Sequence, residues 1–433
     1  MVARYRGRYL FGEWLATLRR LWRRVSKGDA RISRTTTKVS SNLFLKYVRK
    51  KLIGRFEFSR RNDWRRTVGE ALFEWHSGRV SHETASKSLV SILSGLSLDR
   101  VSWEDLILTS RFAMAVGLFQ VSYDFHTASW QALNQSARKF ESAALRFAKL
   151  KQSLYRGQIR IAAEQLKQLQ DSRTHELAGS PLETVDWYIQ CCLGRNVQRK
   201  SHMSPSRVDV LWGEAVCGRD VLLVGPGATH ELPELPEEYL VARVIGPGVY
   251  EWQDPSDLVF NKTDAVYSIP ENLLPGAMRA RPNLQKMVEK FGFVNIKKRD
   301  VLLAPNSRPV ESFWQLFSFG HPQMIPLMVL DVLAHGGRPV VVGSDFFQSS
   351  VAYRDSERRS PEGRVQSANG SDGGEFDRTA LMASHNVFEN WSIIRNLVRA
   401  GLVRGDERFL NACALSPEEL FRRYDETLGK YRI

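Results

Sequence analysis

Two short segments combine residue types that bind phosphate or sugar groups. In the first, Gly225–Thr229, small residues at Gly225, Gly227 and Thr229 would let backbone N–H groups approach a phosphate or a ribose. A tight turn without a ligand needs glycine for the same steric reason. The second is Gly343–Phe347, where an acid at Asp345, preceded by Ser344, could accept hydrogen bonds from a sugar hydroxyl. The ring of Phe347 would exclude water there.

A tyrosine and a histidine follow the second segment. Tyr353 comes first, and His385 comes after a polar, glycine-rich stretch that covers 354–377. Histidine suits the removal of a hydroxyl proton near neutral pH, because its reference pKa is about 6.5. The other interpretation is that His385 caps or packs the start of a helix. The stretch between the two residues is typical of a surface loop and would act as a lid, with arginines at Arg354, Arg358 and Arg359.

Strands and helices that alternate after residue 205 must position these residues. Continuous apolar strands between helices predict an α/β, Rossmann-like, mostly parallel sheet with helices on both faces. Ligands of such sheets bind beyond the carboxyl ends of the strands, where both segments begin. The expected strands are Val221–Val224, Tyr239–Ile245, Ala265–Ile269, Val301–Ala304, Pro339–Val342 and Phe409–Leu415. The expected helices are 284–292, 321–335, 386–400 and 417–428.

Residues 62–205 have apolar side chains at helical spacing, which predicts an all-α domain ahead of the Rossmann-like domain 206–433. We expect this helical domain to serve as a platform or a partner-binding module. Its expected helices are 65–77, 82–95, 103–120, 127–150, 157–170 and 181–193.

A basic arm, 1–61, carries the excess charge of the chain. It holds 18 Lys and Arg against three acids, which accounts for the net charge of +15. Within it, apolar residues from Trp14 to Val25 share one helical face, opposite arginines. Such a helix fits an anionic membrane surface, to which residues 1–27 would bind. Packing on the next domain is the alternative. Specific nucleic-acid binding is not expected, since no recognised nucleic-acid fold accompanies the charge.

Composition narrows the protein class further. The fraction of apolar residues, 43%, is ordinary for a globular protein, and no apolar run is long enough to span a bilayer. The four cysteines, Cys191, Cys192, Cys217 and Cys413, have no metal-ligand spacing. We therefore expect no metal site, a reducing compartment, and a cytoplasmic location with peripheral attachment to the inner face of the membrane.

In order and spacing, these segments resemble the bacterial sialyltransferases that use CMP-sialic acid without a metal. The resemblance covers roughly 218–430 and comprises the glycine loop from Gly225, the GxDF motif at Gly343, the tyrosine at Tyr353, the lid, and the histidine at His385. It implies that His385 is the general base and that Tyr353 binds the departing phosphate. It also implies that Gly343 and Asp345 belong to the donor pocket.

The sequence departs from the family pattern at several positions. Asparagines that read cytidine in the family have no obvious equivalents here. Phe347 and Met382 stand where the family has tyrosines, so two hydroxyl donors to the phosphate are missing. Arginines of the lid would supply that charge instead. The donor is therefore open: another CMP-linked ulosonic acid, a different nucleotide sugar, or none.

The resemblance implies an inverting, metal-independent glycosyltransferase that needs no cofactor beyond its nucleotide-sugar substrate. It would move a sialic-acid-like or other sugar from a nucleotide, with CMP expected, to a glycan or lipid-linked acceptor of the bacterial surface. Two alternatives remain open. One is a different nucleotide-dependent enzyme, similar to flagellin-modifying transferases or pterin pyrophosphokinases. The other is an inactive adaptor that binds nucleotide sugars.

Overall fold

The computed structural model describes the chain from residue 64 to residue 428, with gaps. The described residues are 64–76, 78–139, 142–171, 180–195, 206–225, 239–245, 263–268, 291–294, 306–310, 313–318, 322–348, 382–383 and 385–428. The predicted basic helix near Trp14 and the predicted strand Val301–Ala304 lie outside them. No described helix is long and apolar enough to cross a membrane.

The chain forms two compact units. The first comprises Met1–Ser136, Gly370–Ser384 and Phe421–Ile433, and the second comprises Ala137–Asn369 and His385–Leu420. The described helices between residues 143 and 192 group with the sheet in the second unit. The domains 1–61, 62–205 and 206–433 stay a prediction.

In the described part of the chain, seven helices lie between residues 64 and 192. They are α3 (Trp64–His76), α4 (His82–Ser94), α5 (Trp103–Ala115), α6 (Phe119–Lys139), α7 (Ala143–Tyr155), α8 (Ile159–Asp171) and α9 (Ser180–Cys192). The predicted single helix 103–120 is wrong, because the chain turns at Gly117, which has a φ of 79°. That left-handed conformation ends α5, and the amide of Leu118 donates to the carbonyl oxygen of Ala113. The predicted single helix 127–150 is likewise wrong, because the segment divides into α6 and α7.

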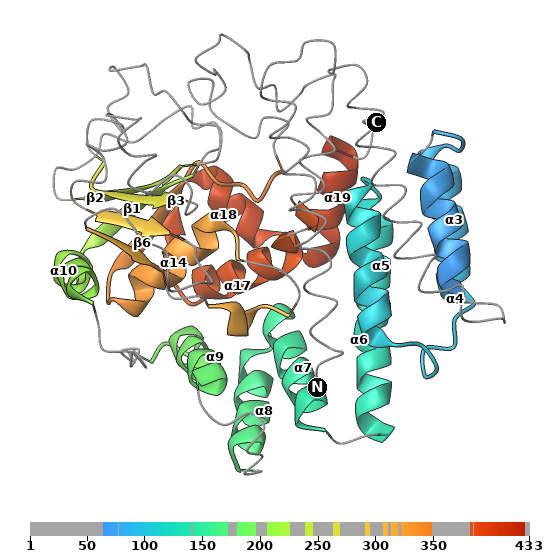
Figure 1. The fold of residues 1–433 in the computed structure, drawn as a ribbon, viewed down its shortest axis with the longest axis horizontal. Helices are drawn as coiled ribbons and strands as arrows, with labels where there is room; N and C mark the ends of the chain where they lie inside the picture. Colours follow the sequence, from blue (N-terminus) through green and yellow to red (C-terminus); the bar gives the residue numbers. More distant parts are fainter. Residues whose placement is uncertain are drawn as a thin grey trace, which may run out of the picture. The chain divides into compact units, whose positions relative to one another are not determined.

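The seven described strands form one parallel sheet (Figure 1). Its order is β5-β4-β3-β2-β1-β6-β7. The strands are β1 (Asp220–Val224), β2 (Leu240–Ile245), β3 (Ala265–Ser268), β4 (Phe291–Val294), β5 (Ser307–Pro309), β6 (Arg338–Val342) and β7 (Arg404–Gly405). The predicted α/β, Rossmann-like fold with a preceding helical region is confirmed.

Both faces of the sheet are buried at its centre. On one face Leu222, Val224, Val241 and Val342 form an apolar cluster, each at most 2% exposed. On the opposite face Val221 and Leu223 are fully buried. This two-sided burial explains why the strands are continuous apolar runs instead of alternating patterns.

The described helices of this region, and one short 3-10 turn, lie before, between and after the strands. They are α10 (Arg207–Val216), η3 (Trp314–Leu316), α14 (Met324–Ala334), α17 (Val387–Arg399), α18 (Glu407–Ala414) and α19 (Pro417–Thr427). The prediction missed α10, which begins with a capping box between Ser206 and Asp209. The predicted helix 284–292 is wrong at its end, since Phe291 and Gly292 belong to β4; its other residues lie outside the described ones.

The predicted strand Phe409–Leu415 is wrong, because this segment lies mostly in helix α18. Asp406 caps the helix by accepting a hydrogen bond from the amide of Phe409. Phe409, Ala412 and Cys413 are the buried residues of α18, at the spacing of one helical face. A short apolar run of this kind fits a strand or a buried helix equally well in sequence.

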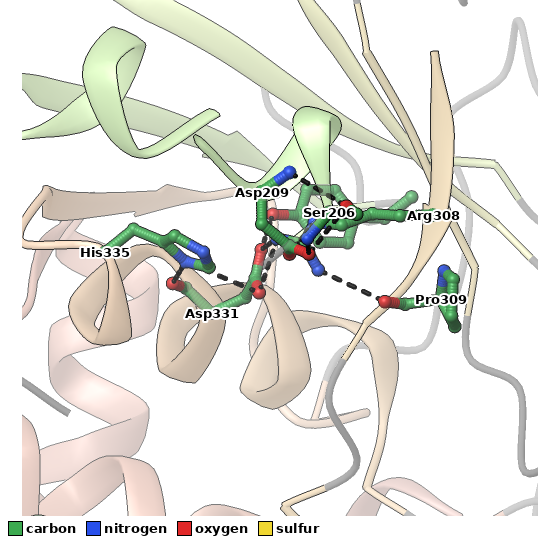
Figure 2. Close-up of polar contacts among 7 residues, drawn as sticks. Ser206, Asp209, Arg308, Pro309, Asp331 and His335 are labelled. Atoms are coloured by element: carbon green, nitrogen blue, oxygen red, sulfur yellow. Dashed lines mark hydrogen bonds and ion pairs between the residues drawn. The ribbon is translucent and has the colours of Figure 1, made fainter. Parts of the chain in front are cut away.

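A buried ion cluster ties the edge of the sheet to two helices (Figure 2). Nη2 of Arg308, on β5, donates to both carboxylate oxygens of Asp331, on α14, at 2.9 and 3.0 Å. Nε of Arg308 lies 2.8 Å from a carboxylate oxygen of Asp209, on α10. The Tyr267 hydroxyl donates to Asp331 from β3 at 2.6 Å. These contacts fix α10 and α14 on the same face of the sheet.

Candidate functional site

The strand order reverses at β1. From β1 the chain adds β2 to β5 on one side, and then returns to add β6 on the other. Val224 and Val342, the last residues of β1 and β6, are direct partners in the parallel register. In open α/β sheets ligands bind at such a reversal, beyond the carboxyl ends of the strands. The two segments singled out in the sequence therefore leave the sheet side by side.

Gly225 and Gly343 contact each other where these segments begin. The amide of Gly225 donates to the carbonyl oxygen of Val342 at 2.8 Å. A Cβ atom at Gly225 would lie 2.4 Å from the carbonyl oxygen of Gly343 and 3.2 Å from Cβ of Ser344. Close packing of the two loops therefore requires glycine at 225. Gly227 and Thr229, the other predicted members of the glycine loop, lie outside the described residues.

The segment after β6 has an unusual backbone. Gly343, Phe346 and Phe347 have φ values of 68°, 53° and 68°. The left-handed region is unfavourable for a bulky residue such as phenylalanine, and such residues cluster at functional sites. The ring of Phe346 is 3% exposed and stacks on Phe409 at a centroid distance of 6.0 Å, which holds this backbone in place.

Three predicted donor-pocket side chains lie on this strained segment. Ser344, Asp345 and Phe347 are all half-buried. The carbonyl oxygen of Asp345 accepts a hydrogen bond from the amide of Gln348 at 3.2 Å, which closes the turn. The backbone of Asp345 thus lies just beyond the end of β6. The role of its carboxylate in binding a sugar hydroxyl stays a prediction.

Asp406 supports the loop after β6, and sequence reasoning missed it. One carboxylate oxygen accepts from the amide of Gly343 at 2.7 Å, and the other accepts from the amide of Phe409 at 2.8 Å. The amide of Asp406 donates to the carbonyl oxygen of Val341. The helix-capping role was visible in sequence as an Asp before an amphipathic segment. The bond to Gly343 depends on the pairing of β6 with β7.

His385 lies directly before the first turn of α17. The crossover from β6 through α17 to the parallel strand β7 requires α17 to run against the strand direction, so its start lies at the carboxyl edge of the sheet. His385 is half-buried. The cap of α17 is the next residue, Asn386, whose side chain accepts from the amide of Glu389. The alternative that His385 itself caps the helix is therefore wrong.

Polar side chains buried in α17 join its first turn to the segment before α14. A carboxylate oxygen of Glu389 accepts from the amide of Ser318 at 2.9 Å. Oδ1 of Asn390 accepts from the amide of Gln323 at 2.8 Å. Glu389 and Asn390 are 1% and 0% exposed. Sequence reasoning missed both, although two polar residues on the inward side of an apolar helix were a usable signal.

A buried tyrosine shares this region. The Tyr155 hydroxyl, from α7, donates to the carbonyl oxygen of Leu316 at 2.8 Å. Burial, and then the charge of Glu389, raise the pKa of Tyr155 well above its ordinary value. The hydroxyl therefore stays protonated and serves as a donor.

Four other predicted site residues lie outside the described part of the chain: Tyr353, Arg354, Arg358 and Arg359. Met382, which stands where the resembled family has a tyrosine, is fully buried.

Comparison of the chain with protein-family models, with curated proteins and with solved structures found no match. Among the described residues, no three His, Cys, Asp or Glu side chains come together as metal ligands would.

Proposed function

We propose that this chain is an inverting, metal-independent glycosyltransferase similar to bacterial sialyltransferases. It would move a sialic-acid-like or other sugar from a nucleotide, in the first place CMP, to a glycan acceptor. The observation that supports this proposal is the contact of Gly225 with Gly343 where the strand order reverses. The two segments that could hold a nucleotide sugar meet there, and the start of α17 lies at the same edge.

In this proposal the donor binds over the two glycines, and Ser344 and Asp345 accept hydrogen bonds from its hydroxyl groups. His385 removes the proton from an acceptor hydroxyl. The acceptor oxygen then forms a bond to the anomeric carbon while the bond from that carbon to the nucleotide phosphate breaks. The nucleotide leaves with the electron pair, and Tyr353 and the arginines at 354, 358 and 359 stabilise its charge.

The basic arm would hold the enzyme at the inner face of the bacterial membrane, where surface glycans are assembled. Its arginines and its apolar face suit an anionic bilayer surface. The acceptor in this proposal is a lipid-linked or surface glycan.

The test is a transfer assay with the full-length chain and a series of CMP-, UDP-, GDP- and dTDP-activated sugars. We expect turnover with one of them, unchanged in EDTA, and a fall in kcat of about a hundredfold or more in His385→Gln. His82→Gln, at the start of α4, is the matched control and should keep full activity. Activity that EDTA abolishes would favour a pyrophosphokinase-like enzyme. Full activity of His385→Gln would remove this residue as the base.

A further inference from the structure

Asn386 holds a buried amide group with an unused donor. The residue is 2% exposed and has a left-handed φ of 45°. Its Oδ1 accepts from the amide of Glu389 at 3.4 Å, which caps α17. Nδ2 has no hydrogen-bond partner among the described residues. A flipped amide does not remove the problem, because Nδ2 would then face the N–H of Glu389, another donor.

A second amide of this kind lies at the start of α14. Gln323 precedes the helix but makes no side-chain cap, and its Nε2 is also a buried atom without a partner among the described residues. Asn390 joins the two positions. Its Oδ1 accepts from the amide of Gln323 at 2.8 Å, and its Nδ2 donates to the carbonyl oxygen of Asn386 at 3.2 Å. The starts of α14 and α17 are thus held together.

The two helix starts and the two amides share one electrostatic character. The N-terminus of a helix carries partial positive charge and unpaired N–H groups, which favour an anion. The first turn of α14 contains no acid. The first turn of α17 contains one acid, Glu389, whose buried carboxylate accepts from the amide of Ser318 and repels an anion. A buried donor without an acceptor costs free energy, and an oxygen anion bound here would remove that cost.

We propose that Asn386 and Gln323 form an oxyanion-binding subsite between the starts of α17 and α14, next to His385. The subsite takes a phosphate or a carboxylate, because each offers several acceptor oxygens to the two amides and to the helix N–H groups. In a glycosyltransferase it would hold the phosphate of the nucleotide or the carboxylate of an ulosonic acid. That last step rests on the proposed function, whereas the binding of an oxyanion does not.

The key variant is Asn386→Asp. The carboxylate keeps an oxygen that caps α17 and interacts favourably with its N-terminus, so the protein stays as stable as the wild type or gains stability. The same change removes the Nδ2 donor and repels an anion. If Asn386 only caps the helix, Asn386→Asp should leave anion binding unchanged. If Asn386 binds the anion, the same change should weaken that binding. Gln323→Glu makes the equivalent change at α14, and Gln168→Glu, on the exposed side of α8, is the matched control.

Binding is measured on the full chain by isothermal titration calorimetry with three probes: inorganic phosphate, CMP and free N-acetylneuraminic acid. We expect at least one probe to bind the wild type, with phosphate and CMP indicating a phosphate site and the sugar acid a carboxylate site. Asn386→Asp and Gln323→Glu should each weaken that probe by roughly tenfold or more. Gln168→Glu should bind it within about twofold of the wild type.

Two results would overturn the subsite: a wild type that binds none of the three probes, or both variants binding as tightly as the wild type. Transfer assays on the same proteins separate this outcome from failure of the proposed function. Oxyanion binding through Asn386 without sugar transfer keeps the subsite and rejects the glycosyltransferase. If the Asn386→Asp enzyme transfers sugar with unchanged KM and kcat, the glycosyltransferase proposal stands and the subsite is rejected.

Discussion

Gly225 lies so close to Gly343 that a methyl group on its Cα would sit 2.4 Å from the Gly343 carbonyl oxygen. The contact joins the ends of β1 and β6, which are far apart in the chain. Each glycine has an explanation in the folded structure alone. A side chain at Gly225 would meet the backbone of Gly343, and Gly343 itself has a left-handed φ of 68°. The relationship that bears on function is their position, at the one edge where a parallel sheet of this order opens toward a ligand.

We expect Gly225→Ala to lower the free energy of unfolding by about 2 kcal/mol or more, because the new Cβ meets backbone atoms that must move. Nucleotide binding should weaken with it. Gly213→Ala, in α10, is the matched control, since a Cβ there meets only ordinary contacts at 3.6 Å. This change in a helix should stabilise the protein by up to about 1 kcal/mol. Urea unfolding measures the free energy of unfolding of both variants. Equal changes in the two variants would contradict a steric clash at Gly225.

Removal of the Asp406 carboxylate should affect stability and ligand binding together. Asp406→Ala loses the cap of α18 and the bond to the amide of Gly343. We expect a loss of about 2 kcal/mol in unfolding free energy and a clear fall in nucleotide affinity. Ser416→Ala removes only the cap of α19. It should cost about 1 kcal/mol and leave affinity unchanged. If Asp406→Ala binds nucleotide as tightly as the wild type, the loop after β6 is not part of the proposed nucleotide site.

Asp331 should stabilise the fold in a pH-dependent way. Burial disfavours its charge, but Arg308, His335 and the Tyr267 hydroxyl outweigh burial and hold its pKa below the usual value. A lowered pKa in the folded state contributes stability above the unfolded pKa of about 3.9, and that stability is lost as the pH falls through the folded value.

Asp331→Asn leaves Arg308 without its buried partner and should cost about 3–5 kcal/mol at pH 7. The difference from wild type should shrink as the pH falls below the unfolded pKa of about 3.9, because the unfolded wild-type chain then takes up a proton that the folded carboxylate still resists. Asp220→Asn, near the surface beside Arg338 and Arg404, is the control and should cost no more than about 1 kcal/mol. Urea titrations from pH 3 to pH 7 test both. A cost that does not change with pH would reject the ion pair as its source.

Deletion of residues 1–27 should release the protein from anionic vesicles, because this segment carries the apolar face and the arginines of the predicted basic helix. Neutral phosphatidylcholine vesicles should bind the wild type weakly. A variant with glutamine at Arg19, Arg20, Arg23 and Arg24 keeps the apolar face and should also lose binding to anionic vesicles. Co-sedimentation measures all three, and unchanged binding of the truncated chain would show that the anchor lies elsewhere.

Apolar runs predicted the centre of the sheet well and its edges poorly. β1, β2, β3 and β6 are buried and continuous, so their sequences carried the signal. β5 and β7 have three and two residues, which is too short for any periodic pattern. The apolar run Phe409–Leu415 fits a strand or a helix equally well. The feature that favours the helix is its cap, Asp406, a single residue that lies outside the run.

In the candidate site, residues with a signal in their own segment were predicted, and residues defined by partners distant in sequence were missed. The Gly225 and Gly343 segments each showed a local glycine signal after an apolar strand, and the structure brings them into contact. Asp406 and Asn390 each showed a local polar signal, but nothing in the sequence near them pointed to the distant backbone groups that they bind. Their partners, Gly343 and Gln323, become neighbours only after strands β6 and β7 pair and helices α14 and α17 pack.

The central place of β1 sets an order of events during synthesis. Strands β2 to β5 follow it directly and can pair as they leave the ribosome, but its other neighbour, β6, is made only when residues 338–342 emerge. Until then β1 presents an open, apolar edge, the kind of surface that recruits foreign strands. The nascent chain therefore passes through a stage that is prone to aggregation, and we expect chaperones to bind it before residue 342 is complete.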